Sequence, residues 1–370
     1  MTTLCYKMLG RVVQVEYGAD PYSVNLMDEL FLYPISQDIV PDVIFRIGPH
    51  QVHGALSNPK IHSFSPGSML ADMHSVIVKW NAYTHPFVVN LSFKKSTRNN
   101  IINPLRRFLD RQYALSWESA GQIFHELVLV PSVYFIKNLV LVHASAMISP
   151  EGQGILVGGT GGVGKTSLEL ELIMHRKWRF LADDIAFLTG SGQIYANLAY
   201  PKIYAYNVRG SSLIRKKLLS GRSVLDRIQW SLRSRISLSG VRRRVNPKDF
   251  YEGRIAQEGK LKAYFILSRE ECNSIEIQGI SPELATILSV EVMKAEYWVF
   301  HQHLYWHRFN ALLAGAKTII DFDDILNRWG AILKQAFSEV PCFVIRIPTH
   351  KTHNEITKYL VNAVEKIINV

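Results

Sequence analysis

Residues 159–166 read Gly-Thr-Gly-Gly-Val-Gly-Lys-Thr, which is a complete G-x-x-x-x-G-K-[ST] motif. Glycine has no Cβ, so consecutive backbone N–H groups in such a loop can turn inward and surround phosphate oxygens. Lys165 is placed to reach the β- and γ-phosphates, and the Thr166 hydroxyl is a suitable ligand for Mg²⁺. The motif therefore predicts a site for a nucleoside triphosphate, ATP, together with Mg²⁺.

The residues on either side of this loop also fit a phosphate site. Residues 154–157 are a short apolar run that predicts a strand, and residues 165–176 predict a helix with an apolar face. A strand, a glycine-rich loop and a helix N-terminus bring free N–H groups and the helix dipole to one point. The predicted nucleotide contacts are Gly159, Thr160, Gly161, Gly162, Val163, Gly164, Lys165, Thr166 and Ser167.

Two consecutive aspartates, Asp183 and Asp184, follow on a strand expected over residues 178–188. Mg²⁺ that bridges phosphates prefers a hard carboxylate ligand, and transfer to a hydroxyl gains from a carboxylate that accepts the proton. The pair could supply both functions; the alternative is that it merely ends a strand. His143, on the strand expected before the loop, could hydrogen-bond one aspartate and tune its pKa.

Together, His143, the glycine-rich loop and Ala182-Asp183-Asp184 resemble the catalytic core of the HPr kinase/phosphorylase family, over roughly residues 135–208. That family phosphorylates a serine on a protein. The resemblance implies that Asp183 is the base, steadied by His143, with Lys165 as a further catalytic residue. It also implies that Asp184 and Thr166 are Mg²⁺ ligands.

The chain departs from the family after the aspartates. The family has a glutamate-bearing, glycine-rich signature there, whereas residues 204–210 read Tyr-Ala-Tyr-Asn-Val-Arg-Gly and no glutamate occurs between Glu171 and Glu252. A third acidic metal contact is therefore missing or supplied elsewhere. In overall style the chain looks more like the kinases that phosphorylate a serine of lasso-peptide precursors.

The organisation along the chain predicts an α/β protein. Residues 1–125 carry short alternating and β-branched runs, which indicate a β-rich N-terminal domain. Residues 126–370 then alternate strands with helices, and the resemblance makes them a kinase domain of the HPr kinase type that contains the loop. Within that domain, residues 209–248 form a basic insertion.

This basic insertion accounts for the net charge of the chain, which is +11. It has twelve Lys or Arg side chains, and Asp226 is its one acid. It could be a solvated insertion, a docking surface for an acidic peptide or phosphorylated substrate, or a nucleic-acid site. The predicted acceptor contacts are Arg209, Arg242, Arg243 and Arg244. The few aromatic residues here argue against a base-stacking platform.

Composition narrows the class of protein further. The chain has 370 residues, of which 48% are hydrophobic and 20% charged, as in soluble globular proteins. No stretch predicts a membrane span or a signal peptide. Cys5, Cys272 and Cys342 form neither a disulfide framework nor a zinc pattern, which fits a reducing cytoplasm. A homo-oligomer is left open.

Two functions remain at this point. The first is an ATP-dependent kinase that phosphorylates a serine hydroxyl of a peptide or protein. The second is an NTPase that acts as a switch or on nucleic acid. The aspartate pair and His143 favour the kinase, while the basic insertion alone favours the NTPase.

Overall fold

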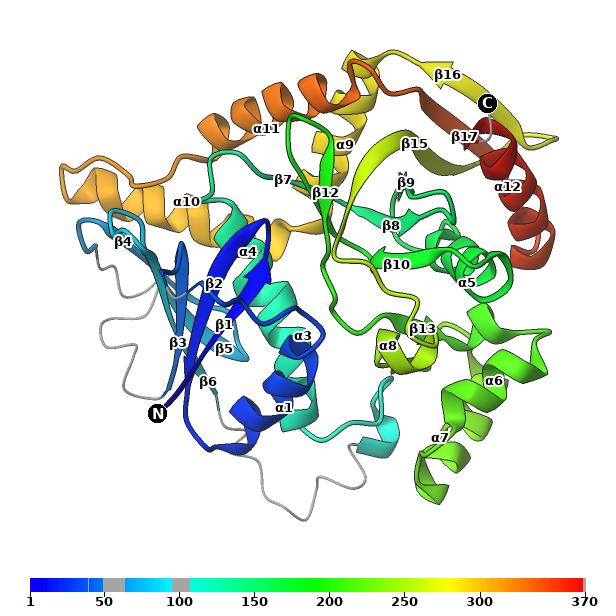
Figure 1. The fold of residues 1–370 in the computed structure, drawn as a ribbon, viewed down its shortest axis with the longest axis horizontal. Helices are drawn as coiled ribbons and strands as arrows, with labels where there is room; N and C mark the ends of the chain where they lie inside the picture. The colour runs from blue at the N-terminus through cyan, green and yellow to red at the C-terminus, as the bar shows by residue number, and fades with distance from the viewer. Residues whose placement is uncertain (39, 49–63, 95–106, 369–370) are drawn as a thin grey trace.

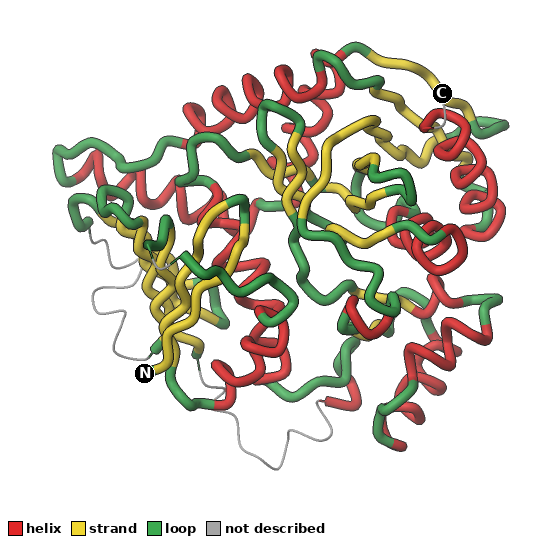
Figure 2. Tube along the Cα trace, in the orientation of Figure 1, coloured by secondary structure: helices red, strands yellow, loops and turns green. Residues whose placement is uncertain are grey.

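The computed structural model describes residues 1–38, 40–48, 64–94 and 107–368. Within these residues the strands form a six-stranded, a nine-stranded and a two-stranded sheet (Figure 1). Helices lie around the outside of the nine-stranded sheet, and a helical run separates it from the six-stranded sheet (Figure 2). The chain is thus a mixed α/β protein. No helix in the described ranges is long and apolar enough to cross a membrane.

The six-stranded sheet is built from the first part of the chain. Its strands in spatial order are β1 (Thr2–Met8), β2 (Arg11–Tyr17), β3 (Val43–Ile47), β6 (Phe87–Phe93), β5 (Val76–Asn81) and β4 (Ser68–Asp72). Alternation puts every second side chain on the core face, so Val76, Val78 and Trp80 are fully buried along β5. The alternating runs in the sequence therefore form the strands that they predict, while the boundary at residue 125 stays a prediction.

Short helices join the six-stranded sheet to the rest of the molecule. They are α1 (Pro21–Leu30), η1 (Trp117–Ser119), α3 (Ala120–Phe124), η2 (His125–Leu129) and α4 (Val130–Val133). Asp20 caps α1 by accepting hydrogen bonds from the N–H groups of Tyr22 and Ser23. The indole N–H of Trp80 in β5 donates to Ser132 Oγ in α4 at 3.0 Å, which fixes the sheet to the helical run.

The nine-stranded sheet carries the glycine-rich loop. Its main path is β10 (Arg179–Ala182), β8 (Ala144–Ile148), β9 (Gln153–Gly158), β15 (Glu258–Glu270), β12 (Gln193–Tyr195), β11 (Ala186–Leu188) and β7 (Val140–Val142), and β17 (Cys342–Pro348) joins β15 to β16 (Glu276–Ile280). β15 is parallel to both β9 and β17. The loop thus leaves the end of a central, buried strand.

Outside the basic insertion, five long helices belong to the described residues of this second part of the chain: α5 (Lys165–Arg176), α9 (Pro282–Glu296), α10 (Trp298–Leu313), α11 (Phe322–Phe337) and α12 (His353–Ile368). α5 packs on β8 and α12, whereas α9 and α11 pack on each other and on β7. Ser281 caps α9, and Pro282 is its first residue.

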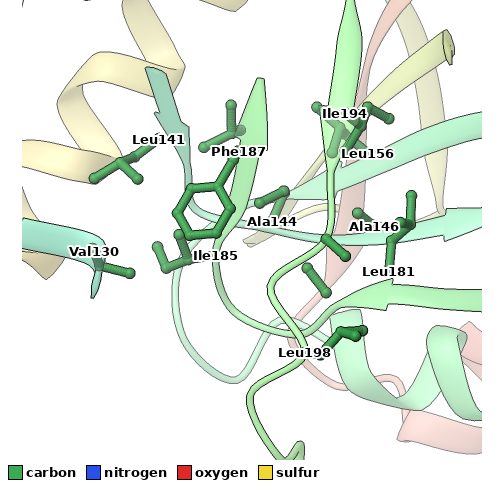
Figure 3. Close-up of a cluster of buried hydrophobic side chains, with 14 of the residues drawn as sticks. Val130, Leu141, Ala144, Ala146, Leu156, Leu181, Ile185, Phe187, Ile194 and Leu198 are labelled. Atoms are coloured by element: carbon green, nitrogen blue, oxygen red, sulfur yellow. The ribbon is translucent and has the colours of Figure 1, made fainter. Parts of the chain in front are cut away.

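Apolar side chains from several strands of the nine-stranded sheet pack together in a buried cluster. Figure 3 shows Ala144, Leu156, Leu181 and Phe187 from four strands meeting in one cluster, and all four are fully buried. Burial of one large apolar side chain contributes on the order of 2–3 kcal/mol. The cluster therefore fixes the strands from whose ends the polar site residues project.

The basic insertion is folded. It forms α6 (Ser212–Leu219), α7 (Val224–Ile236), β14 (Arg242–Arg244) and the start of α8 (Pro247–Phe250), and β14 pairs with β13 (Lys202–Tyr204) in the two-stranded sheet. Ser211 and Ser223 cap the two longer helices. These caps fix the residues at which α6 and α7 begin.

Arg243 holds β14 against α7. Its side chain is fully buried and contacts Asp226 at 2.5 Å and Gln229 Oε1 at 2.6 Å. The guanidinium also lies 5.2 Å from the centre of the Trp230 ring. Burial lowers the pKa of Arg243 to about 10, although Asp226 acts in the opposite direction. A buried charge of this kind is retained only when hydrogen bonds satisfy it, which is the case here.

We expect Arg243→Leu to lower the free energy of unfolding by about 3 kcal/mol, because the buried Asp226 carboxylate loses its closest cation. Arg222, at 3.1 Å from Asp226, limits the loss. Urea denaturation measures the change. Arg227→Leu on the exposed face of α7 is the matched control, with an expected change of about 0.5 kcal/mol or less. Equal stability of the two variants would contradict the structural role of Arg243.

Candidate active site

The glycine-rich loop has a backbone that requires glycine. The loop lies between the end of β9 at Gly158 and the start of α5 at Lys165, with φ values of 124°, 79° and 119° at Gly159, Gly162 and Gly164. L-residues rarely adopt such values. No side chain caps α5 at Gly164, so the first N–H groups of the helix are left for another acceptor. This geometry fits an anion such as phosphate.

Lys165 folds back over the loop. Its Nζ donates to the carbonyl oxygens of Gly159 and Thr160 at 2.8 and 2.9 Å, and the side chain is buried. Burial lowers the pKa of Lys165, and the nearby carboxylates of Asp184 and Asp183 oppose that shift. The lysine therefore stands inside the loop that a triphosphate would enter.

The two aspartates interrupt the strand expected over residues 178–188. That prediction is wrong in detail, because β10 ends at Ala182 and β11 begins at Ala186. The Ile185 N–H donates to the Asp183 carbonyl at 2.8 Å, and Asp184 has a φ of 65°. Aspartate tolerates this left-handed backbone better than most residues, and such strain is concentrated at functional sites.

Asp183 is buried and contacts the start of α5. Its carboxylate accepts hydrogen bonds from Thr166 Oγ1 at 3.2 Å, Ser145 Oγ at 3.3 Å and the Lys202 N–H at 3.4 Å. Burial and the neighbouring Asp184 raise the pKa of Asp183 to about 7. The observed contact thus pairs Thr166 with Asp183, whereas the resemblance pairs Thr166 with Asp184 as metal ligands.

Asp184 is held by a lysine that the sequence interpretation missed. Lys202 Nζ lies 3.5 Å from Asp184 Oδ2 and 2.5 Å from Glu126 Oε1. Burial alone would raise the pKa of Asp184, but Lys202, His143 and Lys165 outweigh it and lower that pKa. Burial alone would also lower the pKa of Lys202, but Glu126 and Asp184 raise it. Asp184 is therefore the ionised member of the pair.

His143 lies between β7 and β8, and not within a strand as expected. Its side chain is buried, and among the described residues neither ring nitrogen has a hydrogen-bond partner. The predicted hydrogen bond to an aspartate is therefore not formed. Burial, followed by the charge of Lys165, lowers the pKa of His143 to about 4, so the ring is neutral at pH 7. Two unsatisfied buried nitrogens beside the aspartates fit a polar ligand.

Glu296 supplies an acidic side chain from a distant part of the chain. It is the last residue of α9, and its Oε1 accepts a hydrogen bond from the Gly161 N–H at 3.2 Å. Its charge also acts on Lys165 and His143. Sequence reasoning found no third acid near the loop, because Glu296 reaches it only through the packing of α9.

Most of these groups line one cavity of about 390 Å³, although Lys165 and Thr166 are not among its lining residues. The charged and polar residues that line it are His125, Glu126, His143, Asp183, Asp184, Asn197, Lys202, Arg244 and Glu296, together with Gly161 of the loop. A larger cleft of about 1040 Å³ lies beside Asn138 and Arg328, but its lining includes neither the glycine-rich loop nor Asp183 and Asp184. The chemistry-bearing residues therefore converge on the smaller cavity.

The structure separates the four arginines that the sequence assigns to an acceptor. Arg242 donates to Tyr204 Oη at 2.8 Å, and Arg244 contacts Glu29 at 2.8 Å and lines the cavity. Arg209 is exposed at a different hollow. The prediction that Arg243 contacts an acceptor is wrong, because its side chain is completely buried against Asp226. Arg243 instead has a structural role.

A preformed metal cage is absent from the described residues, where no three His, Cys, Asp or Glu side chains gather to hold an ion. Mg²⁺ does not need one, since it commonly binds through one or two carboxylates and substrate phosphates and keeps several waters. This mode of binding fits the side chains beside the glycine-rich loop, which are Thr166, Asp183 and Asp184.

Comparisons with known proteins find similarity in structure alone and show no family for the chain. No protein-family model matches the sequence, and no curated protein matches it. The solved structures that are similar include the Hpr(Ser) kinase/phosphatase from Coxiella burnetii, with a TM-score of 0.28 and 13% identity. The match covers 62% of this chain and 98% of that chain. A TM-score this low carries no argument, so the chemistry of the site rests on its own geometry.

We expect Glu296→Gln to strengthen the binding of MgATP roughly fivefold, because phosphate at the loop would otherwise be repelled by this carboxylate with about 1 kcal/mol. Isothermal titration calorimetry gives the dissociation constants. Glu291→Gln removes one charge from the same helix, away from the loop, and should leave the affinity unchanged. Weaker MgATP binding in Glu296→Gln would instead make Glu296 part of the metal site.

Proposed function

We propose that the protein is an ATP-dependent kinase that transfers the γ-phosphate to a serine hydroxyl of a peptide or protein. The observation that supports this most directly is the contact between Thr166 and Asp183. It brings a carboxylate to the first turn of α5, where the phosphates of ATP would lie. The resemblance of the His143, loop and Asp183-Asp184 pattern to HPr kinases supports the same reaction class.

In this proposal Asp183 is the base. The acceptor hydroxyl forms an O–P bond to the γ-phosphorus, its proton moves to Asp183, and the bond from phosphorus to the β–γ bridging oxygen breaks to release ADP. A pKa of Asp183 raised to about 7 suits this role, because a base works best when its pKa is near the working pH. His143 is neutral and buried, and it borders the same cavity. In this proposal it helps to position Asp183 and does not itself exchange a proton.

Asp184 and Thr166 would hold Mg²⁺ between the protein and the phosphates, with Lys165 on the β- and γ-phosphate oxygens. When bound, Mg²⁺ neutralises charge that develops on these oxygens. Lys202 and Glu126 keep the Asp184 carboxylate in place and ionised, since Lys202 bridges the two acids. Electrostatic positioning of this kind is the main contribution of proteins to phosphoryl transfer.

The second candidate is an NTPase, which would use the same loop but pass the phosphate to water. The exposed basic insertion is the observation that favours it, as a switch surface or a contact to nucleic acid. The buried carboxylate beside the loop favours transfer to a hydroxyl. The two functions differ in where the γ-phosphate ends, so one labelling experiment separates them.

We expect γ-labelled ATP to label a serine peptide in the presence of the wild-type chain, and Lys165→Ala to lose the transfer by about 10²-fold or more. The lysine acts through its charge on the phosphates, so the circular dichroism spectrum should not change. Lys317→Ala, at an exposed position, is the matched control. Label that appears only as free phosphate would favour the NTPase, and transfer that persists in Lys165→Ala would refute the loop assignment.

The two aspartates should fail in different ways if one is the base and the other a metal ligand. We expect Asp183→Asn to keep MgATP binding but to lower kcat about 10²–10⁴-fold, the usual contribution of a general base. Asp184→Asn should mainly raise the Mg²⁺ concentration required for half-maximal activity. Magnesium titrations of both variants measure this division. The reverse pattern would exchange the two roles, as the Thr166–Asp183 contact permits.

A further inference from the structure

A second hollow lies in the basic insertion, outside the cavity of the aspartates. It has a volume of about 610 Å³ and lies between η3 (Ala205–Val208), α6 and α7. The residues that define this basic hollow are Arg209, Arg215, Lys216, Leu219, Trp230 and Leu238. The mechanism proposed above uses none of them.

The cations of the basic hollow are not neutralised by the protein. Arg209, Arg215 and Lys216 are exposed, no acidic residue lines the hollow, and within the described residues none of the three forms an ion pair. Neighbouring cations of the insertion behave differently, because Lys217 pairs with Glu252 at 2.7 Å and Arg222 with Asp226 at 3.1 Å. Three unpaired cations around one concave surface therefore favour an anionic ligand.

The floor of the hollow is apolar. Trp230 is 1% exposed, and Leu219 and Leu238 are half-buried at its sides. A free phosphate would use the cations but not this apolar floor. A peptide segment with both acidic and apolar side chains matches both, since such a ligand buries apolar area while its carboxylates meet the cations at the rim.

The hollow begins next to the proposed transfer site. Lys202, which holds Asp184, lies in β13, and η3 follows β13 directly along the chain. Asn207 in η3 donates to Ser167 Oγ at 3.0 Å, one residue after Thr166. η3 therefore connects the hollow with the start of α5, although the hollow and the cavity of the aspartates have no lining residue in common. Resting on the proposed kinase function, we infer that the basic hollow binds an acidic segment of the acceptor beside its serine.

Other occupants fit less well. A second copy of the chain would bring its own insertion, with the same excess of positive charge, against the first. A membrane surface is broad and would contact the exposed apolar side chains of α7, such as Val224, Leu225 and Ile236 at 71%, 62% and 86% exposure, which lie outside the hollow. The concave, cationic hollow instead selects an extended acidic segment.

The test is equilibrium binding without nucleotide, so that it does not depend on catalysis. The probe is a fluorescein-labelled synthetic peptide with one serine flanked by alternating glutamate and leucine, followed by fluorescence anisotropy. We expect Arg215→Gln/Lys216→Gln to weaken binding roughly tenfold, since two ion pairs are lost. The control Arg227→Gln/Arg235→Gln removes two exposed cations from α7 outside the hollow and should leave affinity within about twofold.

A charge swap makes the assignment sharper. The variant Arg215→Glu/Lys216→Glu should no longer bind the acidic peptide. It should instead bind the matched peptide that has lysine in place of each glutamate. Equal weakening by the control pair would overturn the proposal, because binding would then reflect the overall charge. Binding to phosphatidylserine vesicles that depends on Arg215 and Lys216, without peptide binding, would also overturn it. If the peptide binds but is never labelled by ATP, the hollow stands and the kinase function fails.

Discussion

Two adjacent carboxylates beside the glycine-rich loop create the constraint on which the site depends. Asp183 and Asp184 repel each other, and a triphosphate would add further negative charge. The structure offsets this with Lys165 inside the loop and Lys202 across from Asp184. The pKa values of the two aspartates shift in opposite directions, because burial and the charge of Asp184 raise that of Asp183, whereas Lys202, His143 and Lys165 outweigh burial at Asp184 and lower its pKa. One carboxylate is thereby suited to accept a proton and the other to hold a cation.

The same constraint explains why distant segments meet here. β10 must end and the backbone must turn through a left-handed residue, so that both aspartates leave the sheet together. Lys202 then needs its own counter-ion, which Glu126 supplies from the helical run between the sheets. Further back, Glu29 of the first helix pairs with Arg244 at 2.8 Å, and Tyr33 Oη accepts from the Leu198 N–H at 2.7 Å. The N-terminal region therefore packs behind the residues that line the site.

The local parts of the site could be predicted from the sequence, whereas the long-range parts could not. The loop at 159–166 and the aspartates have fixed residue types at short spacing, because phosphate and metal contacts require them. Glu296 and Glu126 have no such signature, since only the packing of α9 and η2 brings them to the loop. The positive charge of Arg243 led to the wrong prediction of an acceptor contact, because composition does not show that Asp226 neutralises this charge inside the fold. The same holds for the strands. The alternating sequence of β5 predicts a strand, but the break in the strand at Asp183 depends on side-chain partners from distant parts of the sequence.

The dependence of ATP binding on Mg²⁺ tests the central claim most directly, since that claim concerns charge and not the identity of the acceptor. Isothermal titration calorimetry with the wild-type chain compares ATP in EDTA with ATP in excess Mg²⁺. The account predicts that Mg²⁺ strengthens binding at least about tenfold, because bare triphosphate faces the carboxylates of Asp184 and Glu296. Equal affinity with and without Mg²⁺, or no binding of ATP in either condition, would contradict it.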